Sequence, residues 1–168
     1  MVRPGRSRKH DPLTDKIRQA IDYATASEAI ALIRKTDIDV LDGDSRTPLI
    51  TASFAGSNEL LTWLISNGAD INHQDRNGWS ALHFAVQEKH ADTILILLTN
   101  GAAIDLKDAY GNTPLWRATF DAKGNYQLVK LLTAHGAEPN SKNKSDRSPL
   151  DFAERISDGE LLAALKDG

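Results

Sequence analysis

The chain repeats a short apolar phrase at regular intervals. The four occurrences read RTPLITA, WSALHFA, NTPLWRA and RSPLDFA. The leucine of each phrase follows the previous one after 33, 33 and 35 residues, at Leu49, Leu82, Leu115 and Leu150. Apolar positions that return at a fixed period of this size indicate a protein built from stacked repeats.

Each phrase predicts the start of a short helix. Thr113 is a good N-cap, and Pro114 would occupy the first helical position, where its missing N–H costs nothing. A second apolar run follows with one-sided helical spacing, for example Leu60, Leu61 and Leu64. A glycine then ends the second helix, because glycine adopts the left-handed conformation without a steric penalty. These glycines are Gly68, Gly101 and Gly136.

The fold class that follows is an all-α solenoid of five stacked helix-turn-helix units with short hairpin turns. One unit is too small to bury its own apolar side, so the core must form between neighbouring units. The first unit lacks the repeated phrase and the last carries charges on its second helix, as expected for capping units. The predicted ranges are a basic tail at 1–10 and a single domain at 11–168, made of an N-terminal capping unit (11–41), three repeats (42–74, 75–107 and 108–142) and a C-terminal capping unit (143–168).

The same phrases resemble the ankyrin repeat, whose pattern runs D-x-x-G-x-T-P-L-H-x-A, then V-x-x-L-L, then G-A-D-x-N. The third repeat matches this pattern at Asp108, Gly111, Thr113, Pro114, Leu115 and Ala118. The resemblance covers roughly residues 42 to 166. It implies stacked helical hairpins that bind other proteins and carry no catalysis. The chain is also similar to small stand-alone bacterial ankyrin proteins, some of which neutralise toxins or restrain enzymes.

Several positions depart from the ankyrin pattern. Ser45 and Asp146 replace the turn glycine, which predicts backbone strain if the turn is unchanged. Lys89 replaces the glycine between the helices of the second repeat, and Trp116 replaces the histidine of TPLH. Two extra residues near Gly124 predict a bulge between the helices of the third repeat. This bulge is either a specificity element or a neutral length variant.

Composition adds expectations about the compartment. The chain has no cysteine, which excludes disulfides and thiolate metal sites. Residues 1–10 hold four basic side chains without an apolar stretch, so they do not form a secretory signal. We expect a disordered, solvated tail there, the alternative being contact with phosphate or an anionic surface. No apolar run approaches the ~18 residues of a membrane span, so a cytoplasmic protein is expected.

The charge balance limits the partners. Outside the basic tail the chain carries 16 Lys and Arg against 23 Asp and Glu, a formal charge of −7. An acidic body argues against nucleic-acid binding and tolerates basic protein partners. We therefore expect a protein partner, no nucleic acid, no membrane, and a monomer when the chain is alone.

Catalytic chemistry has little support in the sequence. The five histidines lack a metal-binding spacing, and no glycine-rich phosphate loop is present. The resemblance implies that His83 bonds to the turn backbone, and Ser and Asp residues such as Ser80 serve as caps. We expect no enzyme activity, no cofactor and no metal, the alternative being an enzyme with an unrecognised site.

Partner-binding residues are expected where the ankyrin pattern leaves the side chain free. Such positions are the hairpin tips, the residue after the turn glycine and the end of the first helix. The predicted partner-binding residues are Arg46, Phe54, Arg76, Asn77, Trp79, Gln87, Tyr110, Asn112, Phe120, Asp121, Lys144 and Arg147, with Asp44, Glu88, Ala109 and Arg155 at equivalent positions.

The aromatic residues among them are the most informative, because aromatic and arginine side chains anchor interfaces. Trp79 and Tyr110 are expected at tips with few neighbours to bury them. Phe54 and Phe120 either cover the next unit or meet a partner. The leading hypothesis is a non-catalytic binding protein that inhibits a bacterial toxin or enzyme, and the alternative is an adaptor that tethers partners without inhibition.

Overall fold

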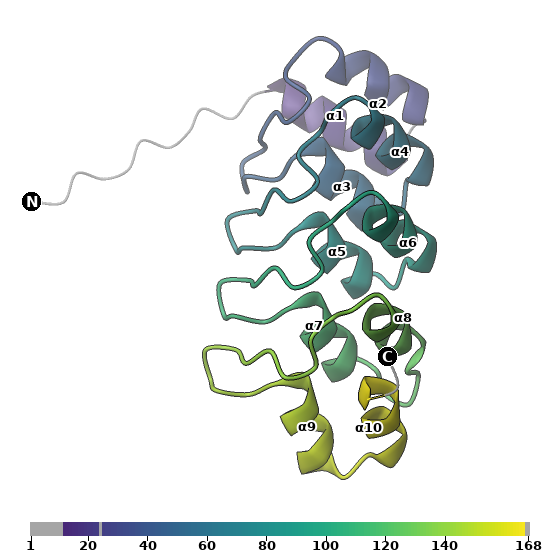
Figure 1. Ribbon diagram of the computed structural model, residues 1–168. Coiled ribbons are helices and arrows are strands. Elements are labelled where there is room, and N and C mark those ends of the chain that lie inside the picture. The colour runs from purple at the N-terminus through teal and green to yellow at the C-terminus, as the bar shows by residue number, and fades with distance from the viewer. Residues whose placement is uncertain (1–11, 24, 167–168) are drawn as a thin grey trace, which may run out of the picture.

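Five helical hairpins make up the part of the chain that the structure describes (Figure 1). The computed structural model describes residues 12–23 and 25–166, so the predicted basic tail at 1–10 lies outside the described residues. The described residues form no β-strand, only one isolated bridge between Gln74 and Ser80. The predicted all-α solenoid is confirmed. Its helices are α1 (Pro12–Tyr23), α2 (Ala26–Ile33), α3 (Pro48–Ala55), α4 (Asn58–Ser66), α5 (Ala81–Gln87), α6 (Ala91–Thr99), α7 (Pro114–Phe120), α8 (Gln127–Ala134), α9 (Pro149–Ile156) and α10 (Gly159–Lys166).

The helices form two layers, with the hairpin turns projecting on one side (Figure 1). The first helix of each unit packs on the first helix of the next, from α1 through α3, α5 and α7 to α9. The second helices form the outer layer, in which α2, α4 and α6 pack in sequence and α8 packs on α10. The pair α6 and α8 approaches less closely than these other outer neighbours.

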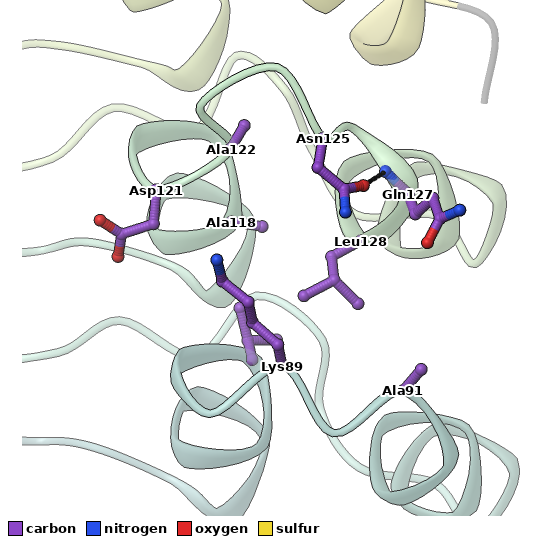
Figure 2. Close-up of a pocket in the computed structure, with 9 residues that line it drawn as sticks. Lys89, Ala91, Ala118, Asp121, Ala122, Asn125, Gln127 and Leu128 are labelled. Carbon is purple, nitrogen blue, oxygen red and sulfur yellow. Dashed lines mark hydrogen bonds between the residues drawn. The ribbon is translucent and has the colours of Figure 1, made fainter.

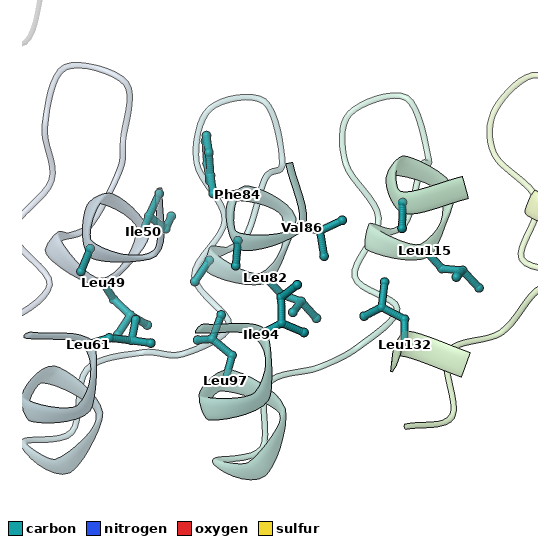
Figure 3. Close-up of a cluster of buried hydrophobic side chains, with 14 of the residues drawn as sticks. Leu49, Ile50, Leu61, Leu82, Phe84, Val86, Ile94, Leu97, Leu115 and Leu132 are labelled. Atoms are coloured by element: carbon teal, nitrogen blue, oxygen red, sulfur yellow. The ribbon is translucent and has the colours of Figure 1, made fainter. Parts of the chain in front are cut away.

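The core is a row of leucines shared between units (Figure 3). Leu49, Leu82 and Leu115 are 0%, 1% and 0% exposed, which confirms the predicted interior row for these three. Leu150 is only partly buried, because it packs against one described neighbouring unit instead of two. Burial of this kind is worth about 1.5–3 kcal/mol for each large apolar side chain.

The hairpin turns are organised by one side chain each. Asp75 Oδ1 accepts the N–H of Asn77 at 2.8 Å and of Trp79 at 2.9 Å. The same pair of bonds recurs in the other turns, and the accepting residues are Asp42, Asp108 and Asn143. Successive turns are also joined through the backbone, in the bonds Arg76 N to Asp44 O, Ala109 N to Asn77 O and Lys144 N to Tyr110 O, at 2.8–3.0 Å. The tips therefore stack at a fixed spacing.

His83 joins the second repeat to the third. Its Nδ1 accepts the Ser80 N–H at 3.2 Å, so the proton lies on Nε2, which donates to the carbonyl of Asn112 at 3.2 Å. Burial lowers the pKa of His83, which keeps the ring neutral and able to accept at Nδ1. The structural role expected for His83 is confirmed. At the equivalent position in the third repeat, the ring of Trp116 instead packs edge-to-face with the ring of Phe152, with 6.1 Å between the ring centroids.

The substituted turn glycines keep the glycine conformation. Ser45 has φ 62° and Asp146 has φ 55°, beside 76° for Gly78 and 81° for Gly111. The predicted strain is therefore present at both residues, because side chains with a Cβ rarely adopt this region. Lys89, with φ 61°, is strained in the same way between α5 and α6.

The extra residues of the third repeat form a long connection between α7 and α8. This α7–α8 loop spans residues 121–126, whereas only Gly56 and Ser57 separate α3 from α4. The Asn125 N–H donates to the carbonyl of Ala122 at 2.7 Å, and Tyr126 donates its hydroxyl proton to Asp158 at 2.6 Å. The predicted bulge is confirmed, and these bonds hold it in one conformation.

Candidate protein-binding surface

Aromatic and arginine side chains follow one another across the inner helices and their turns. We call this set the aromatic–arginine row; it consists of Arg46, Phe54, Trp79, Phe84, Arg117, Phe120, Phe152 and Arg155. Ring–ring and cation–π contacts join these side chains into two groups, which are Arg46, Phe54, Trp79, Phe84 and Arg117, and Phe120, Phe152 and Arg155. The groups follow one another because Arg117 and Phe120 lie three residues apart on α7. The row extends from the first repeat (42–74) to the C-terminal capping unit (143–168).

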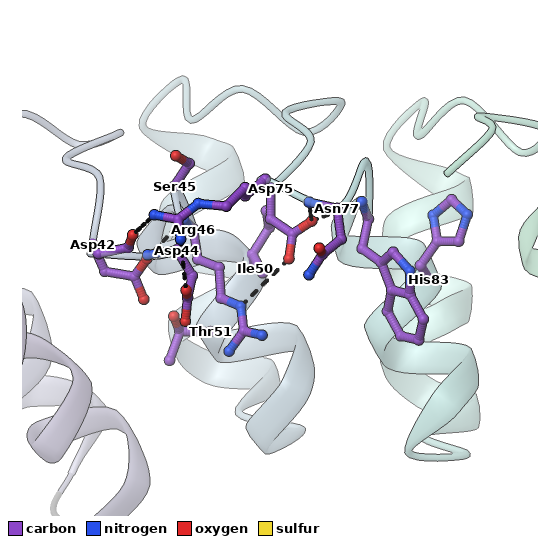
Figure 4. Close-up of polar contacts among 12 residues, drawn as sticks. Asp42, Asp44, Ser45, Arg46, Ile50, Thr51, Asp75, Asn77 and His83 are labelled. Atoms are coloured by element: carbon purple, nitrogen blue, oxygen red, sulfur yellow. Dashed lines mark hydrogen bonds and ion pairs between the residues drawn. The ribbon is translucent and has the colours of Figure 1, made fainter. Parts of the chain in front are cut away.

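Arg46 begins the row and also neutralises a buried charge (Figure 4). Its Nε lies 3.6 Å from Oδ2 of Asp75, whose side chain is fully buried. Its guanidinium carbon lies 4.9 Å from the ring centroid of Phe84. The planar head is thus held in place from two sides, with its side chain about one third exposed.

Trp79 lies at the centre of the row and is half-buried. Its ring centroid is 5.0 Å from that of Phe84, and the guanidinium of Arg117 lies 4.7 Å over its ring. The expectation that Trp79 has few neighbours is therefore wrong, because Arg117 reaches back from α7 to cover it. Arg117 in turn pairs with Asp121 at 3.8 Å.

Phe54 and Phe120 contact their neighbours and also remain open to solvent. Phe54 meets Phe84 edge-on at 6.0 Å, and Phe120 meets Phe152 at 5.5 Å. They are nevertheless 45% and 55% exposed. The first alternative left open by the sequence is observed, because each ring covers the next unit, and contact with a partner stays a prediction for their exposed surface.

The hairpin tips form a second band, separate in contacts from the row. We define this tip band as Arg76, Asn77, Tyr110, Lys144 and Arg147, all exposed. Tyr110, the aromatic member of the band, is 72% exposed. Arg76 is the one member with a charged partner among those described, at 3.7 Å from Asp44.

Two further predicted residues, Asn112 and Gln87, are half-buried. Asn112 donates to Asp108 at 3.4 Å and accepts from the Asn143 side-chain amide at 2.8 Å, so it links two turns. Gln87 is half-buried, and its Oε1 is buried without a hydrogen-bond partner. Of the predicted residues, the structure brings Arg46, Phe54, Trp79, Phe120 and Asp121 into or beside the row.

Sequence reasoning missed Phe84, Arg117 and Phe152. All three occupy the position directly after the histidine position of the repeated phrase, 33 and then 35 residues apart. That position lies on the inner helix but its side chain turns toward the neighbouring aromatic ring. The recurrence of large aromatic or arginine side chains there was a signal that would have found them.

Two other kinds of site have no support in the described part of the chain. Within residues 12–23 and 25–166, no three His, Cys, Asp or Glu side chains gather as a metal would require. No helix in the same ranges is long and apolar enough to cross a membrane.

The chain is similar in sequence to several known proteins. It is 32% identical over 127 residues to an ankyrin repeat protein of fowlpox virus, covering 73% of this chain and 37% of the viral one. It is 40% identical over 85 residues to human neurogenic locus notch homolog protein 1, covering 51% of this chain and 3% of that protein. It is 34% identical over 102 residues to serine/threonine-protein kinase 12 of Arabidopsis thaliana, covering 61% of this chain and 21% of the kinase.

These relatives are all much longer, and the chain spans little more than a third of the viral protein and far less of the other two. The family model for ankyrin repeats in three copies matches residues 19–108 and 52–143. Ankyrin repeats are generally protein–protein interaction modules and typically non-catalytic. Together with the stacked hairpins, this match shows that the chain belongs to the ankyrin repeat family.

Proposed function

We propose that this protein binds a partner protein through the aromatic–arginine row and the tip band, and that binding inhibits the partner. The inhibited protein would be a toxin or an enzyme, with this chain acting as its inhibitor or immunity protein. The observation that supports the proposal most strongly is the row itself. Stacking of the leucines does not require phenylalanines that remain about half exposed, such as Phe54 and Phe120.

The composition of the row suits a binding surface. Tryptophan, tyrosine and arginine dominate interface hot spots, and phenylalanine is enriched in interface cores. Arg46 and Arg117 lie over aromatic rings and beside carboxylates, so a partner would meet side chains that are already ordered. Preordered side chains lose little conformational entropy on binding.

Inhibition would follow from rigid occlusion. The tips are joined by backbone hydrogen bonds from turn to turn, and the inner helices share one buried core. A surface held this firmly can cover an active site at little conformational cost. No change in the shape of this chain is needed for the effect.

The proposal is tested by capture of the partner on the immobilised protein, followed by affinity measurement with purified components. The double variant Phe54→Ala with Phe120→Ala should weaken binding by ~2 kcal/mol or more, because two exposed anchor rings are removed. The matched control is Leu95→Ala, which removes an exposed apolar side chain from the outer helix α6. Equal affinity for the double variant and the control would refute the role of the row.

An activity assay on the captured partner separates inhibition from tethering. Inhibition predicts that the partner loses activity when saturated with this protein and regains it with the double variant. A partner that keeps full activity in the complex would instead make this chain an adaptor.

A further inference from the structure

A pocket opens between the second and third repeats, at the end of the inner helices opposite the hairpin turns (Figure 2). Apolar and polar side chains both line it. The apolar ones are small or branched, from Val86, Ala91, Ala118, Ala122 and Leu128, and the polar ones are Lys89, Asp121, Asn125 and Gln127. They come from four helices and from the two connections between them.

The pocket exists where two departures from the repeat pattern meet. Lys89 replaces a connecting glycine, and the α7–α8 loop carries the extra residues. The outer helices α6 and α8 are the least closely packed neighbours in their layer. Asp121, Ala122 and Asn125 of the longer loop line the pocket, and hydrogen bonds within the loop and from Tyr126 to Asp158 hold the loop in place.

The pocket is lined by one lysine and one carboxylate, Lys89 and Asp121. Lys89 forms no ion pair with any residue that the structure describes, and its side chain extends toward Ala118 and Asp121 of the neighbouring unit (Figure 2). The Asp121 carboxylate is already paired with Arg117 at 3.8 Å. Lys89 also holds a strained left-handed conformation, which the repeat fills with glycine at Gly56. An ammonium group beside an apolar pocket complements a carboxylate beside an apolar side chain.

We propose that this pocket binds one apolar side chain of the partner protein, with Lys89 pairing with an acidic residue next to it. The inference rests on the proposed function and specifies the partner's chemistry at this site. Phe120 of the aromatic–arginine row directly precedes Asp121 at the pocket, so a segment lying along the row reaches both. The occupant is therefore an internal acidic–apolar segment of the partner.

The test uses three short peptides blocked at both ends: Ac-Gly-Leu-Glu-Gly-NH2, Ac-Gly-Leu-Gln-Gly-NH2 and Ac-Gly-Gly-Glu-Gly-NH2. Each is titrated into the 15N-labelled protein, and backbone amide shifts are followed by NMR. The Leu-Glu peptide should shift the amides of Lys89, Ala122 and Leu128. The Leu-Gln peptide should bind about fivefold more weakly, as expected for loss of one partly exposed ion pair. The Gly-Glu peptide should leave these amides unshifted, because it has no side chain to bury.

Two variants and a matched control make the test independent of folding. Lys89→Gly removes the ammonium and relieves the backbone strain, so it should abolish the difference between the Leu-Glu and Leu-Gln peptides while the protein stays folded. Lys123→Gly removes the same charge and the same kind of strain, at φ 45°, from an exposed residue that does not line the pocket. This control should bind like the unmodified protein. Ala91→Leu fills the pocket from its exposed edge and should abolish binding of both leucine peptides.

Three results would overturn the assignment: equal shifts for the Leu-Glu and Leu-Gln peptides in the unmodified protein, a difference between these two peptides that survives Lys89→Gly, or shifts that survive Ala91→Leu. So would the absence of shifts at the pocket. These outcomes leave the affinity of the Phe54 and Phe120 double variant for the captured partner as a separate result. Failure of the pocket can therefore be told apart from failure of the proposed function.

Discussion

At the scale of single residues, Arg46 and Arg117 each combine packing on an aromatic ring with pairing to a carboxylate. Each guanidinium lies within 5 Å of an aromatic ring centroid and within 4 Å of a carboxylate. In this arrangement the charge is partly neutralised inside the protein, while the planar group remains at the surface. Cation–π contacts of this kind are worth ~0.5–1 kcal/mol at exposed sites. The same residues therefore order the surface that a partner would meet.

Replacing Ser45 with glycine should raise the free energy of unfolding by about 0.5–1 kcal/mol. The substitution relieves the left-handed strain at φ 62°, and part of the gain is offset by the greater entropy of glycine in the unfolded chain. The carbonyl of Ser45, which accepts from His73 at 2.9 Å, is unchanged. Chemical denaturation measures the effect.

The opposite exchange, Gly78→Ser, is the control for that experiment. A Cβ at Gly78 would lie 2.9 Å from the backbone nitrogen of Ala109, closer than such atoms normally approach. This variant should be destabilised by ~1–3 kcal/mol. A Ser45→Gly protein that is less stable than its parent would contradict the strain argument.

The buried ring of His83 should make folding sensitive to mild acid. Burial lowers the pKa of His83 in the folded protein below its ordinary value of 6.5, so the unfolded chain binds the additional proton as the pH falls below 6.5. The stabilisation is fully present above pH 6.5 and is lost as the pH falls toward the folded pKa, with a slope of at most ~1.4 kcal/mol per pH unit.

Denaturation profiles of the parent and His83→Gln, recorded between pH 7.5 and 5, measure this contribution. Glutamine stays neutral, so the variant should lack the extra loss of stability, although it is less stable overall. Profiles that run parallel from pH 7.5 to 5 would show that His83 does not titrate differently in the two states.

At the scale of elements, the inner helices were predictable because their start signals lie in the sequence. Thr47, Thr113 and Ser148 cap α3, α7 and α9 through their side chains, as their residue types predict. The start of α8 was harder to place, because its N-cap is Tyr126, which makes no side-chain cap bond. Its position follows from the α7–α8 loop and from the bond between Tyr126 and Asp158 of the next unit. That bond raises the pKa of Tyr126 to about 12.

Leu82→Ala should lower the free energy of unfolding by about 2–5 kcal/mol, because the substitution leaves a cavity between stacked helices. Leu82 belongs to the second repeat and is fully buried. Leu95→Ala, at a side chain that is 38% exposed, should cost far less. Equal losses in urea denaturation would mean that the leucine row does not carry the stability of the stack.

At the scale of the whole molecule, the period of 33 residues predicted the stacking but not which surface side chains meet. The buried leucines could be located because every repeat must fill the same interior position. The aromatic–arginine row depends on contacts between units, such as that of Arg117 with Trp79. The repeat period alone does not reveal which side chains make these contacts. Tyr110 differs, because a hairpin tip has no neighbouring layer, and its exposure was expected from its position.

The central claim is that the partner is bound on the inner helices and not on the outer ones. Hydrogen–deuterium exchange of this protein, alone and saturated with its captured partner, tests it most directly. The account predicts added protection in α3, α5, α7 and α9 and in the turns that carry Trp79 and Tyr110, with exchange in α4 and α10 unchanged. Protection confined to the outer helices, with the inner helices exchanging as in the free protein, would contradict it.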